Sequence, residues 1–121
     1  MGEHKELRMF LVEAVRILQS LEDQILRLST ADTAQTYVMI DKMICLLHTL
    51  KRQALFFGFM EMAMLIRQAV FMLQAIVYES ISVHGENIDL LLDIKNTLKA
   101  MVRELCGIRE NIRVGERVEF H

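Results

Sequence analysis

The stretch DTAQTYVMIDKMICLLHTLKRQALFFGF, residues 32–59, decides the fold because it holds both ends and the core face of one helix. Asp32, with Gln35 three residues later, is typical of a capping box that opens a helix. Gly58 offers the left-handed residue that ends the helix and turns the chain back. Apolar residues at helical spacing predict its core face: Ile40, Met43, Leu47, Leu50 and Ala54.

The sequence on either side continues the helical pattern. A helix is predicted over about 5–28, where apolar residues recur at steps of three and four: Leu7, Phe10, Ala14, Leu18, Leu21, Ile25 and Leu28. Further helices are predicted over about 59–80 and 87–106, with a turn at residues 82–85 between them. There is no proline and there are only five glycines, so long helices can run unbroken. We expect an all-α, up-down four-helix bundle.

The ends of the pattern and the chain length indicate one domain. The fourth helix should end before Gly107, and the tail over 108–121 could form a short fifth helix docked on the bundle. The 121 residues are 53% hydrophobic, which suffices for one core. No repeat, linker or low-complexity tract divides them. Residues 1–121 are therefore predicted to be a single helical domain.

Charge and cysteine content narrow the class of protein. A formal net charge of −2 and a pI of about 6.1 argue against nucleic acid as a partner. Cys45 and Cys106 fall within helical patterns and no signal peptide precedes them, so we expect free thiols in the cytoplasm. The helix over 59–80 is apolar nearly all round but contains Glu61 and Arg67, which favours a buried helix over a membrane span. It should be central in the bundle or covered by a second copy in a homodimer.

One stripe of the helix over 33–57 carries the candidate chemistry. At 100° per residue, Asp41, Cys45, His48, Arg52 and Leu55 lie together, turned away from the core. This places His48 in solvent beside the third helix, level with residues 67–71. A neutral imidazole can accept a phosphoryl group and pass it on, and a cation one turn away steadies the moving charge. An ordinary surface histidine is the alternative interpretation.

Metal and cofactor sites have little support in the sequence. Cys45 and His48 could supply half of a zinc site, but His4, His84 and His121 are distant and no second pair occurs. Neither a Glu-x-x-His pair nor a C-x-x-C-H motif is present. We therefore predict neither a metal nor a cofactor.

Three stretches of the chain resemble one known family. They are a stretch of the first helix that opens with Phe10-Leu11-Val12-Glu13-Ala14, the segment His48-Thr49-Leu50-Lys51 followed by Gly58-Phe59, and the segment Ile88-Asp89-Leu90-Leu91-Leu92-Asp93-Ile94-Lys95. Together they are similar to the histidine phosphotransfer (Hpt) domain, specifically the amino-terminal domain of chemotaxis-type histidine kinases (the CheA family). A histidine, a lysine and a glycine in register within a four-helix layout carry this resemblance.

The resemblance implies a role in a two-component phosphorelay. His48 would accept a phosphoryl group from a histidine kinase catalytic domain and pass it to an aspartate of a response-regulator receiver domain. Lys51 would be the cation beside the phosphoryl group, and Thr49 a neighbouring hydroxyl. The sequence has no glycine-rich phosphate loop, so the chain would be a phosphocarrier without an ATP site. Kinase activity would reside in a partner or in a longer parent chain.

The sequence departs from the family pattern around His48. Arg52 and Gln53 stand where the family has glycine and further small residues that leave room for a receiver. Arg67 and Val70 stand where chemotaxis kinases present a histidine and the glutamate that bonds the other ring nitrogen. Losing that glutamate weakens the imidazole as a nucleophile. Arg52 and Arg67 would instead bracket His48 with guanidinium groups that suit an anion.

Two functions of different classes follow from these matches and departures. In the first, the chain is a phosphocarrier in which Lys51, Arg52 and Arg67 stabilise charge at the histidine. In the second, it is a degenerate Hpt-like adaptor that binds a receiver or kinase domain and regulates it without being phosphorylated. Four apolar neighbours could receive a partner helix in either case: Ile44, Leu55, Met64 and Phe71. Packing inside the bundle is the alternative role for these four.

Overall fold

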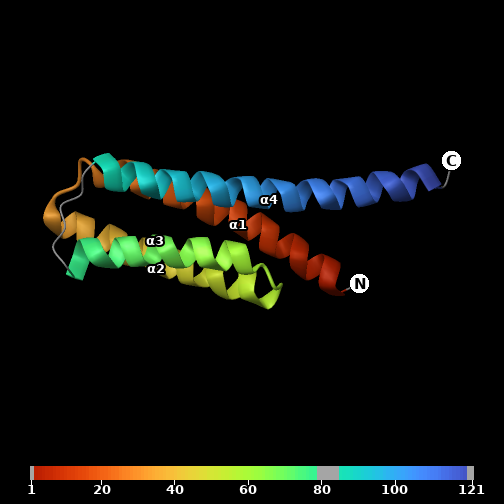
Figure 1. Cartoon of the computed structure of the whole chain (residues 1–121), viewed down its shortest axis with the longest axis horizontal. Helices are drawn as coiled ribbons and strands as arrows, with labels where there is room; N and C mark the ends of the chain where they lie inside the picture. The colour runs from red at the N-terminus through yellow and green to blue at the C-terminus, as the bar shows by residue number, and fades with distance from the viewer. Residues whose placement is uncertain (1, 79–84, 120–121) are drawn as a thin grey trace.

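The computed structural model describes the backbone of residues 2–78 and 85–119 and the side chains of residues 5–78 and 85–107. Four helices form nearly all of this: α1 (Gly2–Leu28), α2 (Thr33–Phe56), α3 (Met60–Tyr78) and α4 (Gly85–Glu119). The described ranges contain no strand. Successive helices run in opposite directions (Figure 1). The predicted all-α, up-down four-helix bundle is confirmed.

The capping box predicted at the start of α2 is present. The backbone N–H of Gln35 donates to Asp32 Oδ1 at 2.8 Å, and the backbone N–H of Asp32 donates to Gln35 Oε1 at 3.4 Å. The Thr36 hydroxyl also donates to the Asp32 carbonyl at 2.8 Å. The capping box thus supplies an acceptor for the N–H of Gln35, which has no acceptor within the first turn of the helix.

The end of α2 requires a glycine. Gly58 has a φ of 77°, in the left-handed region. The N–H of Gly58 donates to the Leu55 carbonyl at 3.0 Å, and that of Phe59 donates to the Ala54 carbonyl at 2.9 Å, which is the paired arrangement of a Schellman motif. An added Cβ would meet no atom within 4 Å. The backbone conformation, and not a lack of space, selects glycine here.

Three phenylalanines fix this turn against α1. The ring centroid of Phe10 lies 5.3 Å from that of Phe57 and 5.8 Å from that of Phe59. Phe57 and Phe59 stack with their centroids 5.9 Å apart. Aromatic pairs at such separations contribute roughly 0.5–1.5 kcal/mol each beyond the area that they bury. The side of α2 that carries Phe57 therefore faces α1.

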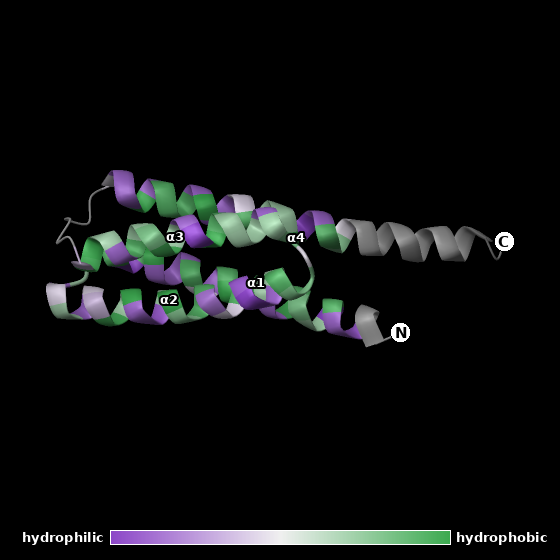
Figure 2. Ribbon diagram, turned by 60° about the horizontal axis from the view of Figure 1, so that its bottom comes forward, coloured by the Kyte–Doolittle hydropathy of each residue, from purple (hydrophilic) through white to green (hydrophobic). Residues whose placement is uncertain are grey.

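The four helices form a ring around one core. α1 and α3 each pack against both α2 and α4, whereas among the described residues no close backbone contact joins α1 to α3 or α2 to α4. The face made by α2 and α3 consequently lies opposite the face made by α1 and α4. All five predicted core residues of α2 are buried, as are those of α1 except the half-buried Leu7. Figure 2 shows green apolar residues alternating with purple polar ones along α1 and α2, as expected for helices buried on one side.

α4 is longer than the sequence pattern predicts. The expected end before Gly107 and the separate fifth helix over 108–121 are both wrong, because α4 runs unbroken to Glu119. A glycine inside a helix costs only about 1 kcal/mol relative to alanine, so it ends a helix only where the chain must turn. α4 continues past the level of the α2–α3 turn (Figure 1). Of the predicted turn over 82–85, residues 82–84 lie outside the described residues, and Gly85 begins α4.

α3 forms one side of the bundle and does not occupy its centre. One face of it is buried: Met62, Ala63, Ile66, Ala69, Val70, Leu73 and Ile76. The other exposes large apolar side chains: Met60, Met64, Phe71 and Tyr78. Within the described part of the chain, α3 is the helix whose length and mean hydropathy of 1.4 would suit a membrane span. α3 packs against α2 and α4, which accounts for its buried apolar face. Its exposed apolar side chains need another explanation.

Candidate functional site

The stripe predicted to face solvent on α2 does so. Asp41, Cys45, His48, Arg52 and Leu55 are all exposed. The buried face of the same helix lies opposite them, so the helical period alone separates the two sets. The imidazole of His48 is accessible to a reacting partner.

His48 lies on the side of α2 that faces α3. Phe57 marks the opposite side, because its ring contacts Phe10 of α1. Ile44 and Lys51, on the flank away from Phe57, are half-buried, as expected for positions that α3 partly covers. Within the solvent-facing stripe, His48 lies on the side nearer this flank. The imidazole is consequently at the exposed edge of the α2/α3 pair.

Arg67 is the cation of α3 at the same level as the histidine. His48 lies ten residues before Gly58 and Arg67 nine residues after it, and antiparallel helices rise equally from their shared turn. Arg67 is exposed, and its Cζ atom lies 5.2 Å from the centroid of the Phe71 ring. That distance is within the range of a cation–π contact. The contact orients the guanidinium along α3, while its N–H groups have no carboxylate partner among the described residues.

Val70 does not stand beside the imidazole. The resemblance implies a hydrogen-bond acceptor for His48 at this position, but Val70 is 5% exposed and its side chain belongs to the core. The exposed residues of α3 near the level of His48 are Met64, Arg67, Gln68 and Phe71. Of these four side chains, the Gln68 amide alone carries a hydrogen-bond acceptor oxygen, and no hydrogen bond joins it to the imidazole. No described residue hydrogen-bonds to the imidazole, so nothing in this part of the chain selects its tautomer.

Two further cations lie next to His48 on α2. Lys51 is half-buried and Arg52 is exposed, and neither has an ion-pair partner in the described ranges. With Arg67 they make three unpaired cations around one histidine, in a chain whose formal net charge is −2. A local excess of positive charge attracts anionic groups and accelerates their encounter. The predicted set His48, Lys51, Arg52 and Arg67 therefore lies on one face.

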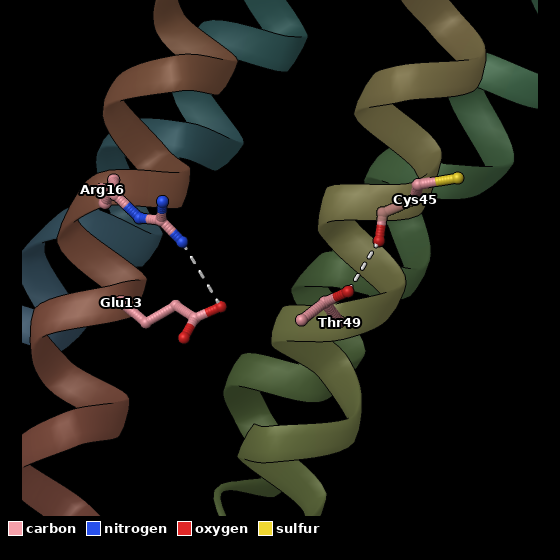
Figure 3. A network of polar contacts seen from close by, with 4 residues as sticks. All are labelled: Glu13, Arg16, Cys45 and Thr49. Carbon is pink, nitrogen blue, oxygen red and sulfur yellow. Dashed lines mark hydrogen bonds and ion pairs between the residues drawn. The ribbon is translucent and has the colours of Figure 1, made fainter.

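Thr49 is less available than its place in the sequence indicates. Its Oγ1 donates to the carbonyl oxygen of Cys45 at 3.1 Å, as the dashed line in Figure 3 shows. The hydroxyl proton is therefore engaged within α2 and is not offered to a bound anion. The cations remain the donors of this face.

The apolar residues predicted to receive a partner are mostly exposed. Leu55 is 45% exposed, Met64 60% and Phe71 56%, whereas Ile44 is half-buried against the core. Sequence reasoning missed Phe56, which is 73% exposed, and Met60, which is 59% exposed. A count of 100° per residue places Phe56 outside the core stripe of α2, so its exposure could have been predicted from the sequence. Exposed apolar side chains surrounding cations are typical of protein-binding surfaces.

The described residues contain no cluster of potential metal ligands. Among the described residues, no group of three His, Cys, Asp or Glu side chains could hold a metal ion. Cys45 is exposed next to His48 but is joined by no further ligand in that part of the chain.

Comparison of the chain with models of protein families, with curated protein sequences and with solved structures gives no match. An exposed imidazole lies at the edge of two antiparallel helices. The same face holds a set of exposed apolar side chains and three cations that have no ion-pair partner in the described part of the chain.

Proposed function

We propose that the chain is a histidine phosphotransfer module of a two-component phosphorelay. The observation that carries the proposal is the exposure of His48 at the edge of α2 and α3, on the face that also holds Lys51, Arg52 and Arg67. The resemblance of the segments around His48 and Gly58 to the Hpt family supports it. The module would be substrate and carrier, and a separate kinase domain would supply the ATP site.

Phosphotransfer would require from the module an accessible imidazole and nearby cations. A lone pair of the exposed ring nitrogen of His48 forms a bond to the γ-phosphorus of ATP held by the kinase, while the bond to the departing ADP breaks. In the second step, a carboxylate oxygen of the receiver aspartate attacks the phosphorus and the imidazole leaves. Lys51 and the two arginines would offset the negative charge of the phosphoryl group in both steps.

The missing acceptor favours slow phosphorylation and firm retention. A hydrogen bond from the second ring nitrogen to a carboxylate raises imidazole basicity, and its loss in comparable sites costs roughly tenfold or more. Guanidinium groups bind phosphate through paired hydrogen bonds, so Arg52 and Arg67 would hold the anion once it is formed. We therefore expect a carrier that is phosphorylated slowly and keeps its phosphate until a receiver docks.

The same observation also favours the second candidate function. An imidazole without an acceptor, beside an arginine held on Phe71, equally suits an adaptor that binds an acidic receiver or kinase surface without carrying phosphate. Both functions use the same face of α2 and α3. Phosphorylation of His48 distinguishes them.

The deciding experiment is incubation of the chain with a chemotaxis-type kinase core, labelled ATP and magnesium, followed by acid treatment. Acid-labile label on the wild-type chain that is lost in His48→Gln establishes the carrier. His84→Gln, the same change elsewhere in the chain, is the matched control and should keep its label. Absence of label from the wild type, together with receiver binding unchanged by His48→Gln, would establish the adaptor instead.

Receiver binding can be located on the same face by alanine variants. Phe71→Ala removes an aromatic ring that is 56% exposed beside Arg67 and should weaken receiver binding about tenfold. Val12→Ala removes a side chain that is 66% exposed on α1 and should leave binding unchanged. A chain that forms dimers through α3 would bury this face against a second copy, and light scattering at several concentrations would reveal it.

A further inference from the structure

A cavity of about 380 Å³ lies between α1 and α4, on the face opposite His48. Val15 and Leu18 of α1 and Val102 of α4 form its apolar lining. Leu18 and Val102 are buried, so the floor of the cavity is continuous with the bundle core. Its volume falls within the range of about 300–1,000 Å³ that is typical of small-molecule sites.

Three cations line the same cavity from successive turns of α4. Lys95 is 6% exposed, and its Nζ atom lies 3.4 Å from Glu22 Oε1, so these two charges compensate each other. Lys99 and Arg103 are exposed and have no ion-pair partner among the described residues. The cavity therefore combines an apolar floor with two uncompensated positive charges at its mouth.

The spacing of the three cations is unfavourable for α4. Lys95, Lys99 and Arg103 are four residues apart, so like charges meet on adjacent turns of α4. Like charges at this spacing destabilise a helix by a few tenths of a kcal/mol per pair. Glu22 forms an ion pair with the buried Lys95 and not with Lys99 or Arg103. An anion seated between Lys99 and Arg103 would relieve the remaining repulsion.

We propose that this cavity binds a small amphipathic organic anion, of the class of a medium-chain carboxylate. The carboxylate would lie between Lys99 and Arg103, which provide charge-assisted hydrogen bonds. The alkyl chain would lie against the exposed Val15, above the buried Leu18 and Val102, and be removed from water. The limited volume favours a small molecule over a partner helix, which would need a groove along the whole face. The proposal is independent of phosphotransfer at His48.

The two cysteines of the chain provide an internal control for the test. Cys106 lines the cavity and is partly exposed, whereas Cys45 is exposed on the α2/α3 face. Full-length chain would be alkylated with iodoacetamide in decanoate below its micellar concentration, and each cysteine followed by mass spectrometry of its peptide. Decanoate at ten times its dissociation constant should slow alkylation of Cys106 about tenfold and leave that of Cys45 unchanged.

The role of charge is tested by a neutral ligand and by matched variants. Decanol, which has the same chain and no charge, should protect Cys106 at least about tenfold less effectively at equal concentration. Lys99→Gln with Arg103→Gln should weaken decanoate binding about tenfold in calorimetry, because two charge-assisted contacts are lost. Arg27→Gln with Lys42→Gln makes the same charge change away from the cavity and should have no effect.

Three results would overturn the proposal. They are the absence of saturable protection of Cys106, equal protection of both cysteines, and equal protection by decanol and decanoate. Loss of binding in both double variants would likewise show attraction to overall charge and not to this cavity. Because the protection assay uses the wild-type chain, its outcome does not depend on whether the variants fold.

Discussion

The two opposite faces of the bundle use the same kinds of residue in different arrangements. On the α2/α3 face, Arg67 and Arg52 lie among apolar side chains that stand out into solvent, such as Phe71 and Met64. On the α1/α4 face, Lys99 and Arg103 line a cavity together with the exposed Val15 and with Leu18 and Val102, which are buried. Raised apolar groups suit a partner protein, and recessed ones suit a small molecule.

The difference also extends to how charge is compensated. The cations around His48 have no carboxylate partner in the described ranges. Arg52 and Arg67 are exposed, and Lys51 is half-buried. Lys95 on the other face is buried and is paired with Glu22. A buried charge destabilises the fold unless it is paired, whereas an exposed charge is solvated by water and needs no partner within the protein. Lys95 is therefore compensated within the fold, whereas Lys99 and Arg103 of the same face, like the cations around His48, have no ion-pair partner among the described residues.

The largest expected effect separates the two sides of α3. Val70→Glu places a carboxylate in the core and should lower the free energy of unfolding by at least about 3 kcal/mol. Arg67→Glu changes an exposed position three residues away and should lower it by less than about 1 kcal/mol, including the lost contact with Phe71. Urea unfolding followed by circular dichroism measures both. Equal losses in the two variants would contradict the assignment of the core face.

The next effect compares two carboxylates of α1 that differ in the burial of their partners. Glu22→Gln leaves Lys95, which is 6% exposed, without a counter-charge and should cost roughly 1–2 kcal/mol, since water still reaches the Glu22 position. Glu13→Gln breaks the pair with Arg16 at 3.7 Å, whose arginine is 79% exposed (Figure 3), and should cost less than about 0.5 kcal/mol. Thermal unfolding of both variants tests the difference. A smaller loss for Glu22→Gln than for Glu13→Gln would refute it.

The third effect concerns the hydrogen-bond acceptor that the imidazole of His48 lacks. It rests on the proposed carrier function. Arg67→Glu puts a carboxylate at the exposed edge of α3, level with His48, and should make phosphorylation by a kinase core about tenfold faster than in Arg67→Gln, because both variants lose the cation and this one gains an acceptor for the second ring nitrogen. Arg67→Gln removes the same positive charge without adding a carboxylate and is the matched control. Initial rates of acid-labile labelling measure the change. Equal rates in the two variants would show that no imidazole acceptor can be supplied from this position.

The smallest effect distinguishes two glycines by their backbone conformation. Gly58→Ala forces a side chain into the left-handed region and should lower the free energy of unfolding by about 1–2 kcal/mol. Gly107→Ala adds a methyl group in open space inside α4 and should raise it by up to about 1 kcal/mol. The melting temperatures of the two variants should therefore move in opposite directions. A loss for Gly107→Ala would indicate that α4 bends there.

Features that depend on one helix could be read from the residues. Asp32 and Gln35 predict the start of α2, Gly58 predicts its end, and the apolar period predicts which residues are buried. The exposure of His48 follows from the same period. The length of α4 was missed because Gly107 looks like a stop signal but is only one costly residue within an otherwise favourable helix.

Features that depend on two helices could not be read in this way. Val70 was expected opposite His48, but the rotation of α3 about its axis puts it in the core and leaves Arg67 at the edge. The cavity between α1 and α4 was missed although the spacing of Lys95, Lys99 and Arg103 is visible in the sequence. Whether neighbouring side chains fill the space beneath such cations depends on how two helices pack.

Local interactions suffice for the helices and their faces, because hydrogen bonds within a few residues and a period of 3.6 set them whatever lies nearby. They settle that residues 32–58 form a capped helix with a buried face and an exposed histidine. Packing of four helices settles which cations are paired, which apolar residues protrude and where a cavity is left. These properties depend on distances between segments far apart in the chain, and no local pattern encodes such distances.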